Sequence, residues 1–440
     1  MSDNKISVAV ATAVGLGAIV GAGIFVLSGT VIALAGAWSL LAFVIVGIIA
    51  IIVAMEFGEL SSMMPKLKGA SYSFVYRAFG SELGFITGIM LYFSYVAAIS
   101  AIALGFGSYL CSLVGISQAY ATYSAIALVV IVTAVNLFGV RKAANMDFGL
   151  VALKLFILMM FAGFALIYAS GSGHLAVSYL TGSAGSFSIS ALFAASVAIF
   201  FAYTGFQTIS TFSNRIRGSR RSAAKAILYA VVISMVVYVL VDIALLMLVP
   251  AGVYKINADP LTYALAYVKA PVWLIDAIGI GAIIATASAA LAMMLSSSRV
   301  MYQMSSNRLL PKVFRRFDQD RDVAGNAVVV SGILGIVVLL GLNSQILIIA
   351  TVSNFGTIFS YIMTSFALMH FRRIKTKAAF RMPLYPYLPV VAIVGLLSLM
   401  YGMPRDALVI GVVAILVMMI VYYALREIEK KKVVMVRLFK

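Results

Sequence analysis

The residues best placed to bind a ligand without a charged side chain lie in the first apolar run, between Gly15 and Phe25. Four glycines fall within nine residues there, at positions 15, 17, 21 and 23. Each glycine inside a helix costs roughly 1 kcal/mol relative to alanine, so the segment favours a break in the helix. A break exposes backbone amides and carbonyls that can hold a ligand. The alternative is close helix packing through small residues.

A second candidate break lies in the sixth apolar run, over residues 200–206. The stretch Phe200-Phe201-Ala202-Tyr203-Thr204-Gly205-Phe206 holds one glycine among four aromatic residues, so an ordinary aromatic packing face is the alternative. Five runs separate the starts of the two breaks. A repeated five-helix unit would therefore enter the membrane from opposite sides in its two copies, which is the geometry of an inverted repeat.

Lys154 is the third candidate, because it lies inside the fifth apolar run, roughly 10 Å along a helix from Asp147. An ionised lysine at that depth is costly, so it is expected to face a cavity, find partners or lose its proton. The alternative is a side chain whose long stem reaches back to the membrane surface.

The composition determines which elements position these residues. The chain has 440 residues, of which 63% are hydrophobic and 10% charged, and its mean hydropathy is +1.10. One soluble core cannot bury that much apolar surface. The sequence predicts an all-α membrane protein of about twelve transmembrane helices, since about 20 apolar residues cross a bilayer. The runs cover 6–35, 39–63, 84–113, 119–138, 148–168, 187–212, 225–249, 272–303, 325–341, 346–370, 386–403 and 406–425.

The basic residues test this map. With the N-terminus inside, 28 of the 32 Lys and Arg residues fall on the inner side and three on the outer, with Lys154 within a span. This asymmetry predicts a multi-pass protein of the cytoplasmic membrane with both termini in the cytoplasm. It also accounts for the net charge of +18 without nucleic acid. The predicted units are a first repeat over 1–168, an inverted second repeat over 187–370, two further helices over 386–425 and a basic tail over 426–440.

Two motifs resemble a known family. Gly17 to Phe25 is similar to the first-span signature of the amino acid–polyamine–organocation transporters, and Phe201 to Phe206 is similar to their sixth-span signature. Further matches follow in order over most of residues 6 to 381: Glu59-Leu60 to Pro65, Gly69-Ala70-Ser71-Tyr72, Arg77-Ala78-Phe79-Gly80, Arg299, Tyr302 and Asn307-Arg308-Leu309-Leu310-Pro311. One departure is the segment Ser213 to Arg220, which has neither the acid nor the proline usual after span six.

The resemblance implies a substrate site built from the two breaks. An amino acid's carboxylate is expected to meet amides around Val20, Gly21, Ala22 and Gly23, and its ammonium to meet carbonyls near Ala18, Ile19 and Ala202. Gly205 forms the second break, and Phe201 takes the place of an aromatic that closes over bound substrate. Helix dipoles agree with this arrangement, because a helix N-terminus favours an anion and a C-terminus favours a cation.

The resemblance also gives Lys154 a role. In proton-coupled members a fifth-span lysine occupies the place of the sodium ion of sodium-coupled relatives, near span one and a span-eight hydroxyl. Ser288 or Thr286 is that hydroxyl here. The hypothesis is that protonated Lys154 braces spans one, five and eight, and that deprotonation releases them.

The other charged residues and motifs indicate no catalysis. Glu56 and Glu59, on one face of span two, are expected to pair with Lys or Arg, and Asp242 and Asp276 to lie at the outer interface. No P-loop, zinc motif or nucleophile constellation appears, so no enzyme activity, cofactor or metal is predicted. The basic inner loops suit anionic membrane lipids, although they would look the same if they only set topology.

Three functions remain open from the sequence. Proton symport of a neutral amino acid is favoured by Lys154. The second is exchange of an amino acid against another amino acid or an amine. The third is a membrane sensor or channel-like protein, and the lack of any sizeable soluble domain argues against a sensor.

Overall fold

A computed structural model describes residues 6–67, 69–139, 143–172, 187–219, 221–256, 258–318, 321 and 323–428. The side chains of Ala22, residues 143–148 and 425–428 lie outside this description, as do residues 429–440 of the predicted basic tail. The described chain is helical throughout, with two isolated β-bridges, Ile6 to Ile216 and Asp318 to Val323. In chain order the elements are α1 (Val8–Ile19), α2 (Ala22–Ala35), η1 (Gly36–Trp38), α3 (Ser39–Met63), α4 (Ala70–Phe79), α5 (Ser81–Val114), η2 (Gln118–Tyr120), α6 (Ala121–Phe138), α7 (Ala143–Ser172), α9 (Ile189–Phe200), η3 (Phe201–Tyr203), η4 (Phe206–Arg215), α10 (Ser222–Leu248), η5 (Ala251–Val253), α11 (Pro260–Tyr267), α12 (Val272–Ser306), η6 (Lys312–Arg315), α13 (Gly325–Gly341), α14 (Ile346–Arg373), α15 (Tyr387–Tyr401) and α16 (Arg405–Ile428).

The predicted apolar runs correspond to these helices. The runs 39–63 and 325–341 coincide with α3 and α13, and most other limits differ by a few residues. Within the described residues, nine helical stretches are long and apolar enough to cross a membrane, while α1, α13 and α15 are shorter apolar helices. The prediction of an all-α membrane protein is confirmed.

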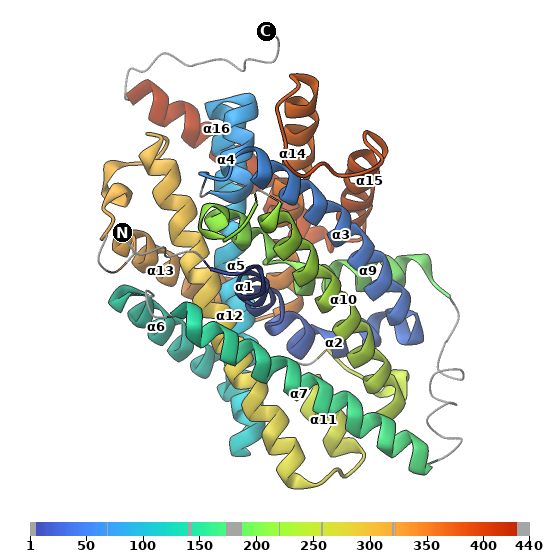
Figure 1. Cartoon of the computed structure of the whole chain (residues 1–440). Coiled ribbons are helices and arrows are strands. Elements are labelled where there is room, and N and C mark those ends of the chain that lie inside the picture. Colours follow the sequence, from blue (N-terminus) through green and yellow to red (C-terminus); the bar gives the residue numbers. More distant parts are fainter. Residues whose placement is uncertain are drawn as a thin grey trace.

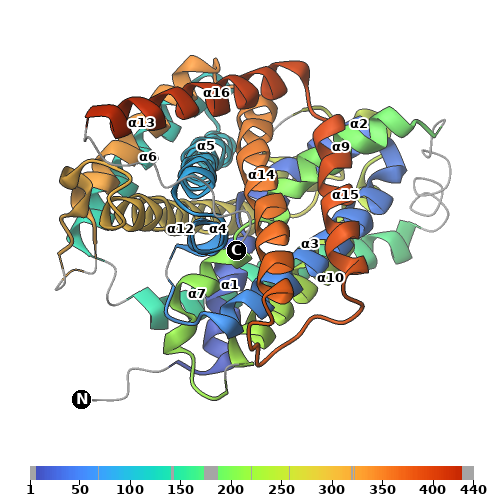
Figure 2. The ribbon, with the colours of Figure 1, turned by 90° about the horizontal axis from the view of Figure 1, so that it is seen from above.

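The first and sixth spans are interrupted inside the helix bundle (Figure 1). The first divides into α1 and α2, and the sixth into α9, the short turn η3 and η4. The halves pack in pairs, α1 against η4 and α2 against α9. The long helices α5 and α12 pack together, α5 also contacting α2 and α12 contacting α1. Helix α16 runs along one edge of the molecule against α14 and α5 (Figure 2).

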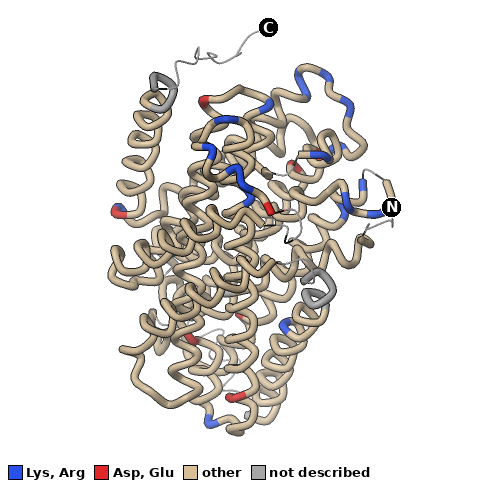
Figure 3. Tube along the Cα trace, turned by 90° about the vertical axis from the view of Figure 1, so that its left-hand side faces the viewer, with Lys and Arg blue, Asp and Glu red and all other residues tan. Residues whose placement is uncertain are grey.

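Most of the Lys and Arg residues gather at one end of the bundle, whereas several Asp and Glu residues lie toward the other end (Figure 3). We call the end with the Lys and Arg residues the basic end, and it contains the described residues 215–219 and 221 of the loop that precedes α10. Ile6, just before α1, is joined to this loop: its amide donates to the Arg215 carbonyl at 2.9 Å, and the Arg217 amide donates to the Ile6 carbonyl at 2.7 Å. The basic loop before α10 is therefore hydrogen-bonded to the residue that precedes α1.

Three buried carboxylates show where the charge predictions succeed and fail. Glu59 forms a bidentate ion pair with Arg372 of α14, as expected. Glu56 is also fully buried, but it accepts a hydrogen bond from Ser365 Oγ at 2.7 Å and forms no ion pair with any described Lys or Arg, so its predicted pairing is wrong. Asp242 is not interfacial: it is fully buried and accepts from Ser39 Oγ at 2.8 Å, because α10 turns this side chain toward α3.

Arg372→Ala is expected to lower the thermal unfolding temperature strongly. The substitution leaves the carboxylate of Glu59 buried without its cation, and such a loss typically costs about 3–5 kcal/mol. Arg373→Ala, at the exposed neighbouring position, is the control and should behave like the parent chain. Equal unfolding temperatures for the two variants in detergent would show that the ion pair contributes little.

Candidate functional site

The first break lies between Ile19 and Ala22. The amide of Gly21 donates to the Ile19 carbonyl at 2.9 Å, and the backbone at Gly21, with φ −137° and ψ −136°, separates the two helices. Gly21 and Gly23 are needed because of close contacts. A Cβ at Gly21 would lie 2.5 Å from Ala289 Cβ, and one at Gly23 would lie 2.1 Å from Ala202 Cα. The glycines thus allow the first break to touch spans six and eight.

The second break lies at Thr204 and Gly205. Gly205 has φ +117°, a conformation that favours glycine, and its amide donates to Gln207 Oε1 at 2.8 Å. A Cβ here would lie 2.6 Å from the Ala18 carbonyl oxygen. The two breaks therefore meet backbone to backbone, with the end of α1 against the start of η4.

A tyrosine that the sequence analysis did not single out links the two breaks. The Tyr238 hydroxyl of α10 lies 2.8 Å from the Ile19 carbonyl oxygen and 3.1 Å from the Ala202 carbonyl oxygen. These are two of the carbonyls expected to hold a substrate ammonium. In this structure a side chain hydroxyl donates where that ammonium is expected.

Tyr238→Phe tests this overlap. The substrate would no longer displace a hydroxyl from the two carbonyls, so the apparent KM should fall two- to tenfold, corresponding to a hydrogen bond of about 0.5–1.5 kcal/mol. Tyr254→Phe instead removes a buried hydroxyl just after η5, where it donates to the Leu245 carbonyl, and should leave KM unchanged. A rise in KM with unchanged thermal stability would mean that Tyr238 helps to hold the substrate.

Lys154 projects from α7 toward the end of α1. Its side chain is 1% exposed, and its Nζ donates to the Gly17 carbonyl oxygen at 3.0 Å. The last carbonyls of a helix carry partial negative charge and have no partner within the helix. An ammonium is therefore well placed there, and the alternative of a stem reaching back to the surface is wrong.

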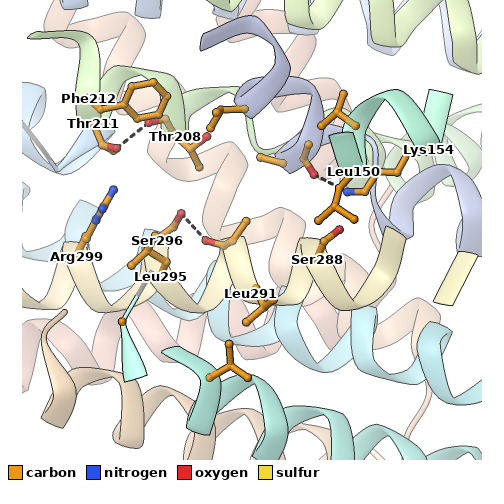
Figure 4. A pocket seen from close by; sticks show the side chains of 17 residues that line it. Leu150, Lys154, Thr208, Thr211, Phe212, Ser288, Leu291, Leu295, Ser296 and Arg299 are labelled. Atoms are coloured by element: carbon orange, nitrogen blue, oxygen red, sulfur yellow. Dashed lines mark hydrogen bonds between the residues drawn. The ribbon is translucent and has the colours of Figure 1, made fainter. Parts of the chain in front are cut away.

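Lys154 and Ser288 lie at one end of a cavity of about 310 Å³ (Figure 4). The other end is marked by Phe212 and Arg299, and hydroxyl groups line the space between them. The full lining is Val14, Gly17, Ala18, Val135, Gly139, Leu150, Val151, Lys154, Thr208, Thr211, Phe212, Ser288, Leu291, Ala292, Leu295, Ser296 and Arg299. A smaller cavity of about 80 Å³ shares Thr211, Phe212 and Arg299 with it and also contacts Arg215. Together the two cavities extend from the first break toward the basic end.

The structure brings only some of the predicted site residues to this cavity. Ala18, Lys154 and Ser288 line it. Thr286 does not, because it is fully buried and its hydroxyl donates to the carbonyls of its own helix, at Ala282 and Ile283. The remaining predicted residues with described side chains lie at the two breaks and are not among the lining residues: Ile19, Val20, Gly21, Gly23, Phe201, Ala202 and Gly205. Ala22 begins α2 at the first break.

Several lining residues were missed by the sequence analysis. Thr208 and Thr211 lie three residues apart on η4, and Ser296 lies on α12 (Figure 4). Hydroxyl side chains are common in membrane helices, where they bond to the preceding turn, as Thr211 does to Thr208. Their spacing alone therefore did not distinguish them from ordinary helix residues.

Known proteins resemble this chain over nearly its whole length. The chain is 27% identical over 437 residues to a methylthioribose transporter of Bacillus subtilis (strain 168), covering 94% of this chain and 91% of that protein. It is 26% identical over 442 residues to the branched-chain amino acid permease BcaP of Lactococcus lactis subsp. cremoris (strain MG1363), covering 96% and 94%.

Among solved structures, the fold resembles that of a manganese transporter mutant from Eremococcus coleocola, with a TM-score of 0.59 over 94% of this chain and 93% of that one. At 13% identity this likeness concerns the fold alone. The amino acid permease family model matches residues 10–433. With the two interrupted spans in place and the match covering nearly the entire sequence, the chain belongs to the amino acid permease family, within the amino acid–polyamine–organocation transporters.

Proposed function

We propose that this protein imports a neutral amino acid together with a proton, by alternating access around the two helix breaks. The observation that carries the proposal is the hydrogen bond from Lys154 Nζ to the Gly17 carbonyl, at the cavity that Ser288 also lines. It joins a titratable group to the span whose break is the candidate substrate site.

The backbone around the breaks suits a zwitterion. The first amides of α2, from Ala22 and Gly23, lack partners within the helix and favour a carboxylate. The carbonyls of Ala18, Ile19 and Ala202 favour an ammonium. Phe201, buried beside them, would close over the substrate. BcaP, named as a branched-chain amino acid permease, supports a neutral substrate of this kind.

Protonation of Lys154 would be coupled to movement of α1 relative to α7. When protonated, its ammonium braces α1 against α7, and Ser288 brings α12 to the same point. When deprotonated, the amine binds the Gly17 carbonyl less strongly, because hydrogen bonds from charged donors are about twice as strong as neutral ones. Loss of the proton would therefore release α1 from its neighbours.

The orientation follows from charge. We place the basic end in the cytoplasm, with both chain termini on that side of the cell membrane. The cavity from Lys154 to Arg299 is then the inner half of the transport route. The two five-helix units over 1–168 and 187–370 would act as the inverted repeats, with 386–425 outside them.

The test is uptake of radiolabelled amino acids into proteoliposomes, with and without an inward proton gradient. Branched-chain and other neutral amino acids should accumulate only with the gradient, and lysine should serve as the charged comparison. Uptake that ignores the gradient and needs substrate inside the vesicle would contradict symport.

That second result would support exchange, the other candidate. The observation that favours exchange is the burial of Lys154, which is 1% exposed and already hydrogen-bonded. A lysine that keeps its proton throughout the cycle would be a fixed brace and would couple nothing.

A further inference from the structure

A second hollow lies on the other side of the contact between α1 and α7. This groove, of about 380 Å³, is lined by residues of α1, α7 and α10: Val8, Ala9, Thr12, Ala13, Leu16, Val151, Ala152, Leu155, Tyr229 and Ile233. Its lining is almost entirely apolar, since the hydroxyl of Thr12 donates to the Val8 carbonyl of its own helix at 2.9 Å. Tyr229 and Ile233 are 53% and 39% exposed, so the groove opens to the surroundings of the helix bundle. In a membrane those surroundings are lipid chains.

Basic residues mark one end of this groove. Lys225 is exposed and precedes Tyr229 and Ile233 at four-residue spacing, so these three residues share one face of α10. Arg221, the exposed N-cap of α10, lies one turn earlier, and its guanidinium donates to the Ala379 carbonyl at 2.7 Å. From the α1 side, the backbone of Arg217 is hydrogen-bonded to Ile6, two residues before Val8 of the groove. The described lining residues include no carboxylate. A lipid whose acyl chain occupies the groove would therefore have its headgroup beside these basic residues.

This basic segment lies in the loop before α10. The loop from Ser213 to Arg220 contains three arginines and no acidic residue, and the structure describes two of the arginines, Arg215 and Arg217. Juxtamembrane basic residues attract anionic lipid by about 1 kcal/mol each. The hydrogen bonds between this loop and Ile6 therefore place cations beside an apolar groove.

We propose that the groove between α1, α7 and α10 binds one anionic phospholipid of the membrane, with an acyl chain against Ala152 and Tyr229 and the phosphate at Arg217 and Lys225. The bound chain stabilises the packing of α1 on α7. Val151 lines both this groove and the cavity that contains Lys154. The lipid therefore contacts the interface between α1 and α7 from the side opposite that cavity. The lipid site does not depend on the transported substrate.

The experiment measures lipid binding directly, without transport. Purified protein is titrated with phosphatidylglycerol or phosphatidylcholine in detergent, and bound lipid is counted by native mass spectrometry alongside thermal unfolding. The parent chain should retain one phosphatidylglycerol and unfold at a higher temperature with it, whereas phosphatidylcholine should have little effect. The double variant Arg217→Gln, Lys225→Gln should bind phosphatidylglycerol about tenfold more weakly or worse.

Two further variants make the result specific. Ala152→Phe fills the groove without changing charge and should also release the lipid, even if the double variant folds poorly. Lys312→Gln with Arg315→Gln removes two exposed charges from η6, away from the groove lining, and should bind like the parent. Equal weakening by both charge pairs, or unchanged binding in Ala152→Phe, would overturn the proposal. Normal lipid binding by a chain that transports no amino acid would contradict only the proposed function.

Discussion

Lys154→Arg is expected to abolish proton-driven accumulation while retaining part of the amino acid exchange. Arginine stays protonated at all physiological pH values, so it can maintain a cationic brace to the Gly17 carbonyl but cannot release a proton. Lys154→Ala should reduce both activities to near background, because the brace between α1 and α7 is removed. Initial rates in proteoliposomes, with an imposed gradient and then with only internal substrate, separate the two activities.

The control for this pair is Lys312→Ala, since Lys312 is an exposed lysine of η6 that does not line the cavity containing Lys154. It should transport like the parent protein. Gradient-dependent accumulation at the parental level in Lys154→Arg would exclude Lys154 as the residue that exchanges the proton. The lysine would then be structural, and exchange would become the better hypothesis.

Gly205→Ala is expected to eliminate transport with a clear loss of thermal stability. Two effects act together at this position. The backbone has φ +117°, which an L-residue adopts only with strain of about 1–3 kcal/mol, and the new Cβ would lie 2.6 Å from the Ala18 carbonyl oxygen. Relief of that contact must move the end of α1 away from η4, and the candidate site lies between them.

Gly163→Ala provides the matched control for the glycine. It is the same substitution in α7, where a Cβ would meet no atom within 4 Å, so transport should be unchanged. Uptake assays and thermal unfolding in detergent measure both variants. Parental uptake by Gly205→Ala would show that the contact between the two breaks is not needed in the transport cycle.

The structure suggests that α1 is the responsive element in these experiments. One side of α1 faces the cavity with Lys154, another faces the apolar groove, and its end touches Gly205. Protonation of Lys154, binding of a lipid and binding of substrate would then all alter the packing of α1, a helix of 12 residues. The distance between α1 and α7, measured by cross-linking or spectroscopy, would report each of these three events.

The sequence indicated where the helices run and marked two places where a helix could break, with close packing as the open alternative at both. The lengths of the apolar runs set the spans, as the 25-residue helix α3 shows, because a bilayer requires about 20 apolar residues. Lys154 stood out for the same reason, since a charge inside an apolar run is costly. The glycines at 21, 23 and 205 marked the breaks because helix formation disfavours them.

Only the tertiary structure decided which side chains meet. Tyr238 reaches the carbonyls of Ile19 and Ala202, Asp242 turns inward to Ser39, and Ser288 rather than Thr286 lines the cavity with Lys154. The physical reason is that helices apolar on every side carry little information about their rotation. A helix in water shows its buried face by a stripe of apolar residues. In lipid both faces are apolar, so rotation is set by packing against neighbours distant in the sequence.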